Sequence, residues 1–210
     1  MIKELFRQFT DIIFVNLLWI LTSFLGLLIT LGAATTAMFR VTQQILKKNE
    51  PTNVLHLYIQ SFKENFWIST LVWVVLLVLA APLFYMYHYA LNQEIFILLV
   101  IAIIGAYQLL IVTIYIFPII ATFKTKNYYQ LMKNTLIIAN TNLWTNFKVL
   151  GSLAFLILLI FVVHESLILI GVGIYGVLVS FHLKKVFKPY LLELGDNNEE
   201  EGNENAIFKF

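Results

Sequence analysis

The sequence predicts an all-α protein, a polytopic transmembrane helical bundle of about five spans with two amphipathic cytoplasmic connector helices. Five stretches without Asp, Glu, Lys or Arg predict the spans: residues 12–39, 67–93, 95–123, 149–164 and 166–183. About 20 apolar residues in a helix cross the roughly 30 Å hydrocarbon core of a bilayer. Such runs must be helical because lipid offers no partners to backbone polar groups. Composition agrees, with 60% hydrophobic and 12% charged residues.

One helical membrane domain is expected over residues 1–190, and an acidic, disordered cytoplasmic tail over residues 191–210. The net charge of +2 is small and the basic residues are spread between the spans, so nucleic-acid binding is not expected. The chain has no cysteine, which excludes disulfides, thiolate metal ligands and cysteine nucleophiles.

Basic residues predict the orientation, because cytoplasmic loops carry the excess of Lys and Arg. Of the 14 basic residues, all but Lys3 and Arg7 follow the first, third or fifth span: Arg40, Lys47, Lys48 and Lys63; Lys124, Lys126, Lys133 and Lys148; Lys184, Lys185, Lys188 and Lys209. We therefore expect these segments and the C-terminus in the cytoplasm. Five single crossings would leave the N-terminus outside.

The first apolar stretch leaves two topologies open. Residues 12–39 are long for one straight span and short for two, and Gly26 and the small residues at 32–37 are candidate breaks. A single, interrupted crossing is the preferred interpretation. A broken or re-entrant helix would instead leave both ends of the stretch inside, which agrees with Lys3 and Arg7 as well.

The two connectors, residues 51–66 and 127–143, are predicted to be amphipathic helices. Pro51 suits the first turn of the first connector. Its apolar residues recur every three or four positions and form one stripe: Leu55, Tyr58, Ile59, Phe62 and Phe66. The stripe is a candidate surface for docking a partner or a lipid headgroup. The favoured alternative is that it covers the cytoplasmic mouth of the protein's own bundle.

Two further patterns resemble known sites. Residues 171–176, Gly-Val-Gly-Ile-Tyr-Gly, match the dinucleotide fingerprint, but inside an apolar span glycines more often let a neighbouring helix approach. His88, Glu94, His164 and Glu165 would all lie at the outer face, where a metal or pH-sensitive cluster is one reading and solvated loop residues the favoured one. We therefore expect no metal, no cofactor and no catalytic residue.

The spans offer only uncharged polar groups, such as Asn16 and Gln108, which can form hydrogen bonds between helices. Ion-coupled transport usually needs ionisable groups within the membrane, so a proton- or sodium-driven pump is disfavoured. A passive pore, or an accessory to another membrane machine, remains open.

Four segments carry a resemblance to a known family: Asn16-Leu17-Leu18-Trp19 and residues 30–37, 61–66 and 117–121. In this order they resemble the YesL-like family of bacterial membrane proteins, a family defined as a domain of unknown function. The likeness spans most of residues 1–190. Many members have a proline near the position of Gly26, and this chain has none. The family-motif or packing positions are Asn16, Trp19, Gly32, Thr36, Phe62, Asn65 and Pro118.

The resemblance implies a multi-pass protein of the bacterial cytoplasmic membrane with no known catalytic residues. Members are often encoded beside carbohydrate uptake systems, which implies an accessory to a sugar ABC importer, with its permease as partner. We therefore expect a non-enzymatic accessory to carbohydrate uptake. The alternative is a small-solute transporter or channel that acts as a homo-oligomer.

Overall fold

The computed structural model describes residues 2–46, 53–123 and 127–201, which form helices and no strand. The helices are α1 (Ile2–Leu25), α2 (Leu31–Ile45), α3 (Val54–Glu64), α4 (Phe66–Asn92), α5 (Phe96–Thr122), α6 (Tyr128–Thr141), α7 (Leu143–Val162) and α8 (Ile168–Glu201), with a short 3₁₀ turn at Glu165–Leu167. Five of them, α1, α4, α5, α7 and α8, contain stretches long and apolar enough to cross a membrane. The predicted helical class is confirmed.

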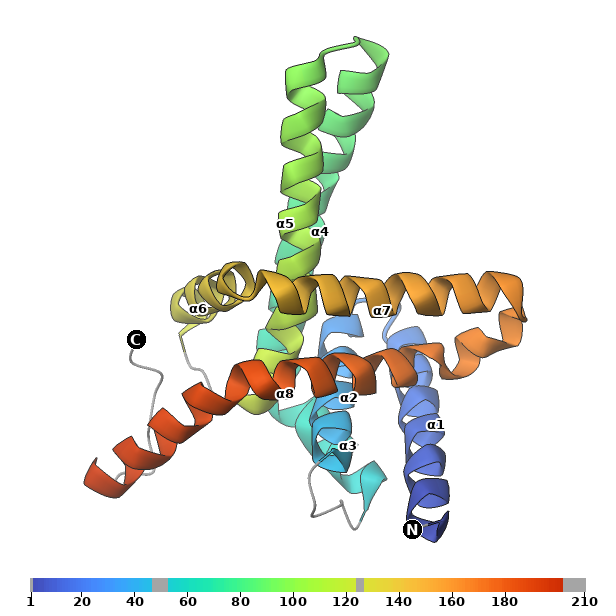
Figure 1. The fold of residues 1–210 in the computed structure, drawn as a ribbon, viewed down its shortest axis with the longest axis vertical. Coiled ribbons are helices and arrows are strands. Elements are labelled where there is room, and N and C mark those ends of the chain that lie inside the picture. Colours follow the sequence, from blue (N-terminus) through green and yellow to red (C-terminus); the bar gives the residue numbers. More distant parts are fainter. Residues whose placement is uncertain (1, 47–52, 124–126, 202–210) are drawn as a thin grey trace.

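The long helices form two pairs that cross (Figure 1). Helices α4 and α5 lie side by side along the long axis of the molecule, and α7 and α8 lie side by side across it. Helix α8 packs against α1 and α2, and so joins its pair to the rest of the protein. Apolar helix surface therefore faces outward in two different directions, an arrangement that the apolar runs alone do not predict.

Residues 12–39 form most of a helical hairpin and not the single interrupted crossing that we preferred. Helix α1 ends at Leu25, the chain turns over residues 26–30, and α2 runs back beside α1 (Figure 1). Leu27 and Leu28 adopt left-handed backbone conformations, with φ of 49° and 63°. The turn is held by the Thr30 hydroxyl, which donates to the carbonyl of Thr22 at 2.8 Å. Because α2 has 15 residues, it is about 22 Å long and shorter than the bilayer core.

Both connectors are helical, as predicted, and each begins at an asparagine. The Asn53 side chain accepts from the backbone N–H of His56 at 3.0 Å, and the Asn127 side chain accepts from that of Tyr129 at 3.0 Å. Asparagine is among the best N-cap residues because its side-chain oxygen satisfies a free N–H of the first turn. Pro51, which we placed in the first turn of α3, lies outside the described residues.

The last helix extends further than predicted. We expected an acidic, disordered tail from residue 191; in the structure α8 runs through Pro189 to Glu201, so the first part of this segment has a helical backbone. Leu and Glu, which are frequent in this stretch, have high helix propensity. The rest of the expected tail, residues 202–210, lies outside the described residues.

The core lies where the second half of α5 meets its neighbours. From Ile111 to Ala121 every residue of α5 is buried except Thr113, which is half-buried, whereas in the first half only Ala102 is buried. The second half packs against α2, α4 and α6. The polar groups described below surround this core.

Candidate functional site

The small residues of α2 let its neighbours lie close, and α4 approaches it at Gly32. Gly32, Ala33, Ala34 and Ala37 are all buried. A Cβ at Gly32 would clash with the backbone carbonyl oxygen of Ser69 and lie 2.7 Å from Cβ of Trp73. The same contact carries a buried hydrogen bond of 2.8 Å between the hydroxyls of Thr36 and Ser69. Gly32 and Thr36 are therefore packing residues of α2, and the small-residue stretch does not break the helix as we had considered.

Two other family-motif residues fix α1 to its neighbours. The indole Nε1 of Trp19 donates to the hydroxyl of Thr35 on α2 at 3.0 Å. The fully buried Asn16 accepts, through Oδ1, a hydrogen bond from the backbone N–H of Gly173 on α8 at 2.7 Å. Side-chain hydrogen bonds of this kind hold helices together in membranes, where apolar contact alone gives little preference for protein over lipid.

Tyr58 anchors α3 beneath this hairpin. Its side chain is only 1% exposed, and its hydroxyl lies 2.7 Å from the hydroxyl of Thr22 on α1. When Thr22 donates its own hydrogen to the carbonyl of Leu18 at 2.8 Å, Tyr58 is the donor to Thr22; the Tyr58 hydroxyl also lies 3.4 Å from the carbonyl of Ala34 on α2. Burial raises the pKa of the Tyr58 phenol above its ordinary value. The phenol therefore keeps the proton that this hydrogen bond requires.

The rest of the predicted docking stripe divides into buried and exposed residues. Phe62 and Phe66 are half-buried. Leu55 and Ile59 are 41% and 42% exposed. The face of α3 that packs inward carries Val54, Tyr58 and Ser61, so it is rotated from the predicted stripe. Only Leu55 and Ile59 remain as an outward apolar pair.

Asn65 lies at the junction of α3 and α4. Its side-chain amide donates to the carbonyl of Ser61 at 3.0 Å, and its backbone N–H donates to the same carbonyl at 3.1 Å. The backbone bond is an ordinary helical bond, and the side-chain amide adds a second donor to the same carbonyl in the last turn of α3. Asn65 therefore ends one helix where the next begins.

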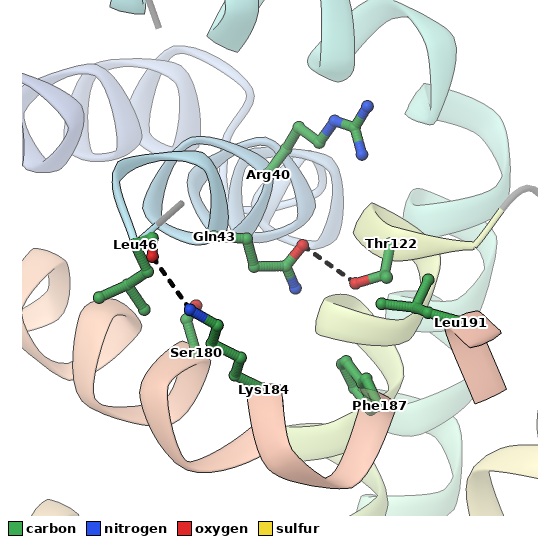
Figure 2. A pocket seen from close by; sticks show the side chains of 8 residues that line it. All are labelled: Arg40, Gln43, Leu46, Thr122, Ser180, Lys184, Phe187 and Leu191. Atoms are coloured by element: carbon green, nitrogen blue, oxygen red, sulfur yellow. Dashed lines mark hydrogen bonds between the residues drawn. The ribbon is translucent and has the colours of Figure 1, made fainter. Parts of the chain in front are cut away.

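Pro118 belongs to a polar junction between α2, α5 and α8, shown in Figure 2. Its carbonyl accepts from the Gln43 amide at 3.2 Å and from the Thr122 hydroxyl at 2.7 Å. Thr122 also lies 3.0 Å from Oε1 of Gln43 (Figure 2). On the other side of α2, the hydroxyls of Thr42 and Ser180 are 2.9 Å apart and buried. This is where the three helices are tied together.

A cavity of about 120 Å³ opens at this junction. Its lining is largely polar where α2 meets α5 and apolar farther along α8, at Phe187 and Leu191. The lining residues are Arg40, Gln43, Leu46, Thr122, Ser180, Lys184, Phe187 and Leu191 (Figure 2). Two cations and no acidic residue line it. A small anion or a polar group with an apolar neighbour fits this chemistry.

The two cations satisfy the ends of two helices. Arg40 donates through Nη1 to the carbonyl of Ala121 in the last turn of α5 at 3.0 Å. Lys184 donates to the carbonyl of Leu46, which caps α2, at 3.2 Å (Figure 2). Cations are favourable at helix C-termini because the last carbonyls carry partial negative charge. Both side chains thus have a structural role beside any role in the cavity.

The predicted cluster of His88, Glu94, His164 and Glu165 is divided between two connections. The α4–α5 connection and the α7–α8 connection lie at different ends of the molecule (Figure 1). His88 instead packs against the ring of Phe84, with centroids 4.4 Å apart, and His164 bonds Ser166 at 2.9 Å. Within residues 2–46, 53–123 and 127–201, no group of three or more such side chains that could hold a metal is found.

The glycines of residues 171–176 lie at helix crossings. A Cβ at Gly173 would lie 2.9 Å from the carbonyl oxygen of Ile12, and one at Gly176 would lie 3.0 Å from Cε of Met38. At Gly171 the nearest atom, in Ile160, is 3.6 Å away, an ordinary contact. Gly173 and Gly176 thus let α8 cross α1 and α2 closely, as the membrane interpretation of this motif predicted.

The sequence did not predict which side chains form hydrogen bonds with one another between helices. Thr42 and Ser180 are 138 positions apart, and nothing in the sequence pairs them. The same holds for Tyr115, which donates to Oδ1 of the buried Asn146 at 2.7 Å. The two N-cap asparagines did have a signal, because each directly precedes an amphipathic stretch.

Comparison with known proteins gives one match. A family described as "Protein of unknown function, DUF624" matches residues 12–87, which is less than half of the chain. Neither the curated proteins nor the solved structures include a match to this chain. The matched region contains most of α1, all of α2 and α3, and most of α4, and hence the bonds of Trp19, Thr36 and Tyr58; the bond of Asn16 leaves the region because its partner is Gly173. In this region the chain is similar to a family whose function is unknown.

Proposed function

We propose that this integral membrane protein is a non-enzymatic accessory that binds another membrane protein along the α4/α5 hairpin. The observation that carries the proposal is the outer half of this hairpin, which among the described residues is largely exposed: in α5 only Ala102 is buried before Ile111. Each helix has 27 residues, about 40 Å of length, which exceeds the hydrocarbon core of a bilayer. A surface of this reach can contact a partner within the membrane.

One face of α5 is suited to such a contact. Ile97, Ile101 and Ile104 are exposed at intervals of four and three residues and therefore share one side of the helix. Branched side chains in fixed rotamers give a helix surface a definite shape, on which another helix can interlock. Lipid can cover the same surface, so the proposal requires that a partner displace lipid there.

The identity of the partner rests on the resemblance to YesL-like proteins alone. We propose the permease of a sugar ABC importer, since members of that family are encoded beside such systems. The exposed pair Leu55 and Ile59 on α3 is a second candidate contact, on the same element that carries the buried Tyr58.

We also propose that both ends of the described chain face the cytoplasm. The outside location of the N-terminus followed from a single crossing by residues 12–39, and the hairpin removes that premise. With both ends of the hairpin on one side, Lys3 and Arg7 join the other basic residues inside, as expected from the distribution of Lys and Arg.

Single cysteines test this topology directly, because the chain has none of its own. Phe6→Cys and Lys63→Cys should resist a membrane-impermeant maleimide in intact cells, whereas Gln93→Cys in the α4–α5 connection should react. All three should react after the membrane is opened. Labelling of Phe6→Cys together with Gln93→Cys in intact cells would return the N-terminus to the outside.

The accessory function is tested by purifying the tagged protein from its native membrane in mild detergent and identifying what comes with it. We expect a sugar permease in fixed ratio. Ile101→Phe should lower its recovery, because the larger ring alters the shape of this face while leaving it apolar. Leu158→Phe, at an exposed position of α7, is the matched control.

Other outcomes assign other functions. Loss of the permease in Leu55→Ser/Ile59→Ser, but not in Ile101→Phe, would move the contact to α3. Recovery of this chain alone as a defined homo-oligomer would contradict the accessory role and support the transporter or channel, which flux assays in liposomes would then examine.

A further inference from the structure

A second hollow, which shares Lys184 with the cavity at the α2/α5/α8 junction, lies between the first turn of α7 and α8. It has a volume of about 560 Å³ and is lined by Asn142, Trp144, Thr145, Lys148, Phe181, His182, Lys184, Lys185, Val186 and Lys188. We call this hollow the basic groove. It lies at one end of two of the apolar helices long enough to cross a membrane.

The basic groove is strongly positive. Four lysines and one histidine line it, and none of its lining residues is acidic. Lys148, Lys185 and Lys188 are exposed, so their ammonium groups are available to a ligand. The N-terminus of α7, at Asn142–Thr145, opens on the same space and adds partial positive charge. Several positive charges close together favour the binding of an anion that makes more than a single weak contact with them.

One side of the basic groove continues into apolar surface. Trp144, Lys148, Gly151 and Phe155 follow one another at intervals of three or four residues along α7 and therefore share a face. Trp144 is 72% exposed and Lys148 lies over its ring, 5.7 Å from the centroid. At Gly151 a Cβ would meet nothing within 4 Å, so the face is notched there. Phe155 beyond it is also exposed.

We propose that the basic groove binds the headgroup of an anionic phospholipid, with an acyl chain along α7 over Gly151 toward Phe155. The phosphate would lie among Lys148, Lys185 and Lys188. Basic pockets between membrane helices bind anionic lipid headgroups, and tryptophan favours the depth at which headgroups meet acyl chains. A soluble anion would use the lysines but has no need of the apolar face. Binding of the lipid in the basic groove requires no partner protein.

Native mass spectrometry of the full chain in neutral detergent tests this. The purified protein is titrated with phosphatidylglycerol, with phosphatidylcholine of the same acyl chains, and with glycerol phosphate. The wild type should bind phosphatidylglycerol at least about tenfold more tightly than the other two. Lys148→Gln/Lys185→Gln should weaken phosphatidylglycerol binding by about 30-fold and leave phosphatidylcholine unchanged.

Lys63→Gln/Lys133→Gln is the matched control, because it removes two exposed lysines of the connectors α3 and α6. It should change the affinity less than about twofold. Gly151→Leu fills the notch without touching a charge, and should weaken phosphatidylglycerol binding while leaving glycerol phosphate unaffected. An equal loss in the control, equal affinity for the two lipids, equally tight glycerol phosphate, or no effect of Gly151→Leu would each overturn the proposal.

Discussion

The two hairpins of this protein, α1/α2 and α4/α5, are built from similar apolar residues but are held in different ways. Side-chain hydrogen bonds join α1 and α2 to each other and to α3, α4 and α8. These bonds involve Asn16, Trp19, Tyr58 and Thr36. Among the described residues, the side-chain hydrogen bonds from α4 to other elements lie near its start, at Ser69 and Trp73, where the helix meets α2 and the turn before it. Beyond that point α4 and α5 pack chiefly against each other.

The difference teaches that hydropathy alone does not identify which apolar helices form the core. Both hairpins are free of charge over long stretches, yet the α1/α2 hairpin has buried small and polar residues on several sides. Small residues allow close approach and polar side chains give direction, and these two features select protein neighbours over lipid. In the outer half of α4/α5 small residues such as Ala90, Ala102 and Gly105 serve the contact between these two helices, and most of the remaining helix surface is exposed to lipid or a partner.

The largest expected effect compares the two halves of α5. Ile111→Ala should lower the free energy of unfolding in detergent by about 3 kcal/mol, because a fully buried side chain leaves a cavity. Ile104→Ala, the same change on the exposed half, should cost less than about 0.5 kcal/mol. Denaturant titration of the purified protein measures both. Equal losses would show that the outer half is packed in the folded protein.

A smaller effect is expected for Gly32→Ala, at the crossing of α2 and α4. The added methyl meets the backbone of Ser69, which cannot rotate away, so the helices must separate, at a cost of about 2 kcal/mol. Gly151→Ala is the control: its methyl enters open space, and the better helix propensity of alanine should leave stability unchanged or raised. The same titration measures both, and an unchanged stability for Gly32→Ala would contradict the close crossing.

The sequence predicted much of the fold and little of the site, for physical reasons. Charge-free runs predicted the long helices, and three- and four-residue spacing predicted α3 and α6. The turn at residues 26–30 was considered only as an alternative, because Leu27 and Leu28 are not typical turn residues and hydropathy does not change there. We predicted an apolar face of α3 that contains Tyr58 and Phe62, whereas the residues buried in the structure are Val54, Tyr58 and Ser61. The spacing of apolar residues alone does not show which neighbour a helix meets.

Gly173→Ala tests how α8 joins the α1/α2 hairpin. Its methyl would lie 2.9 Å from the carbonyl oxygen of Ile12 and 3.0 Å from Cβ of Asn16. We expect a loss of about 1.5 kcal/mol, since the shift also lengthens the bond from the Gly173 N–H to Asn16. Gly171→Ala, two positions away with only an ordinary contact, should cost nothing measurable. Similar melting temperatures for the two variants would argue against a close α1/α8 contact.

The smallest effect concerns the single hydroxyl that ties α3 to α1. Tyr58→Phe removes the donor to Thr22 but keeps the ring in place, so the loss should be about 1 kcal/mol. Tyr129→Phe, on the exposed side of α6, is the control and should have no effect. Thr22→Val in the Tyr58→Phe background should then cost less than in the wild type, because the two hydroxyls share one bond. Strictly additive losses would mean that the bond between Tyr58 and Thr22 adds nothing to stability and that apolar contacts hold α3 against α1.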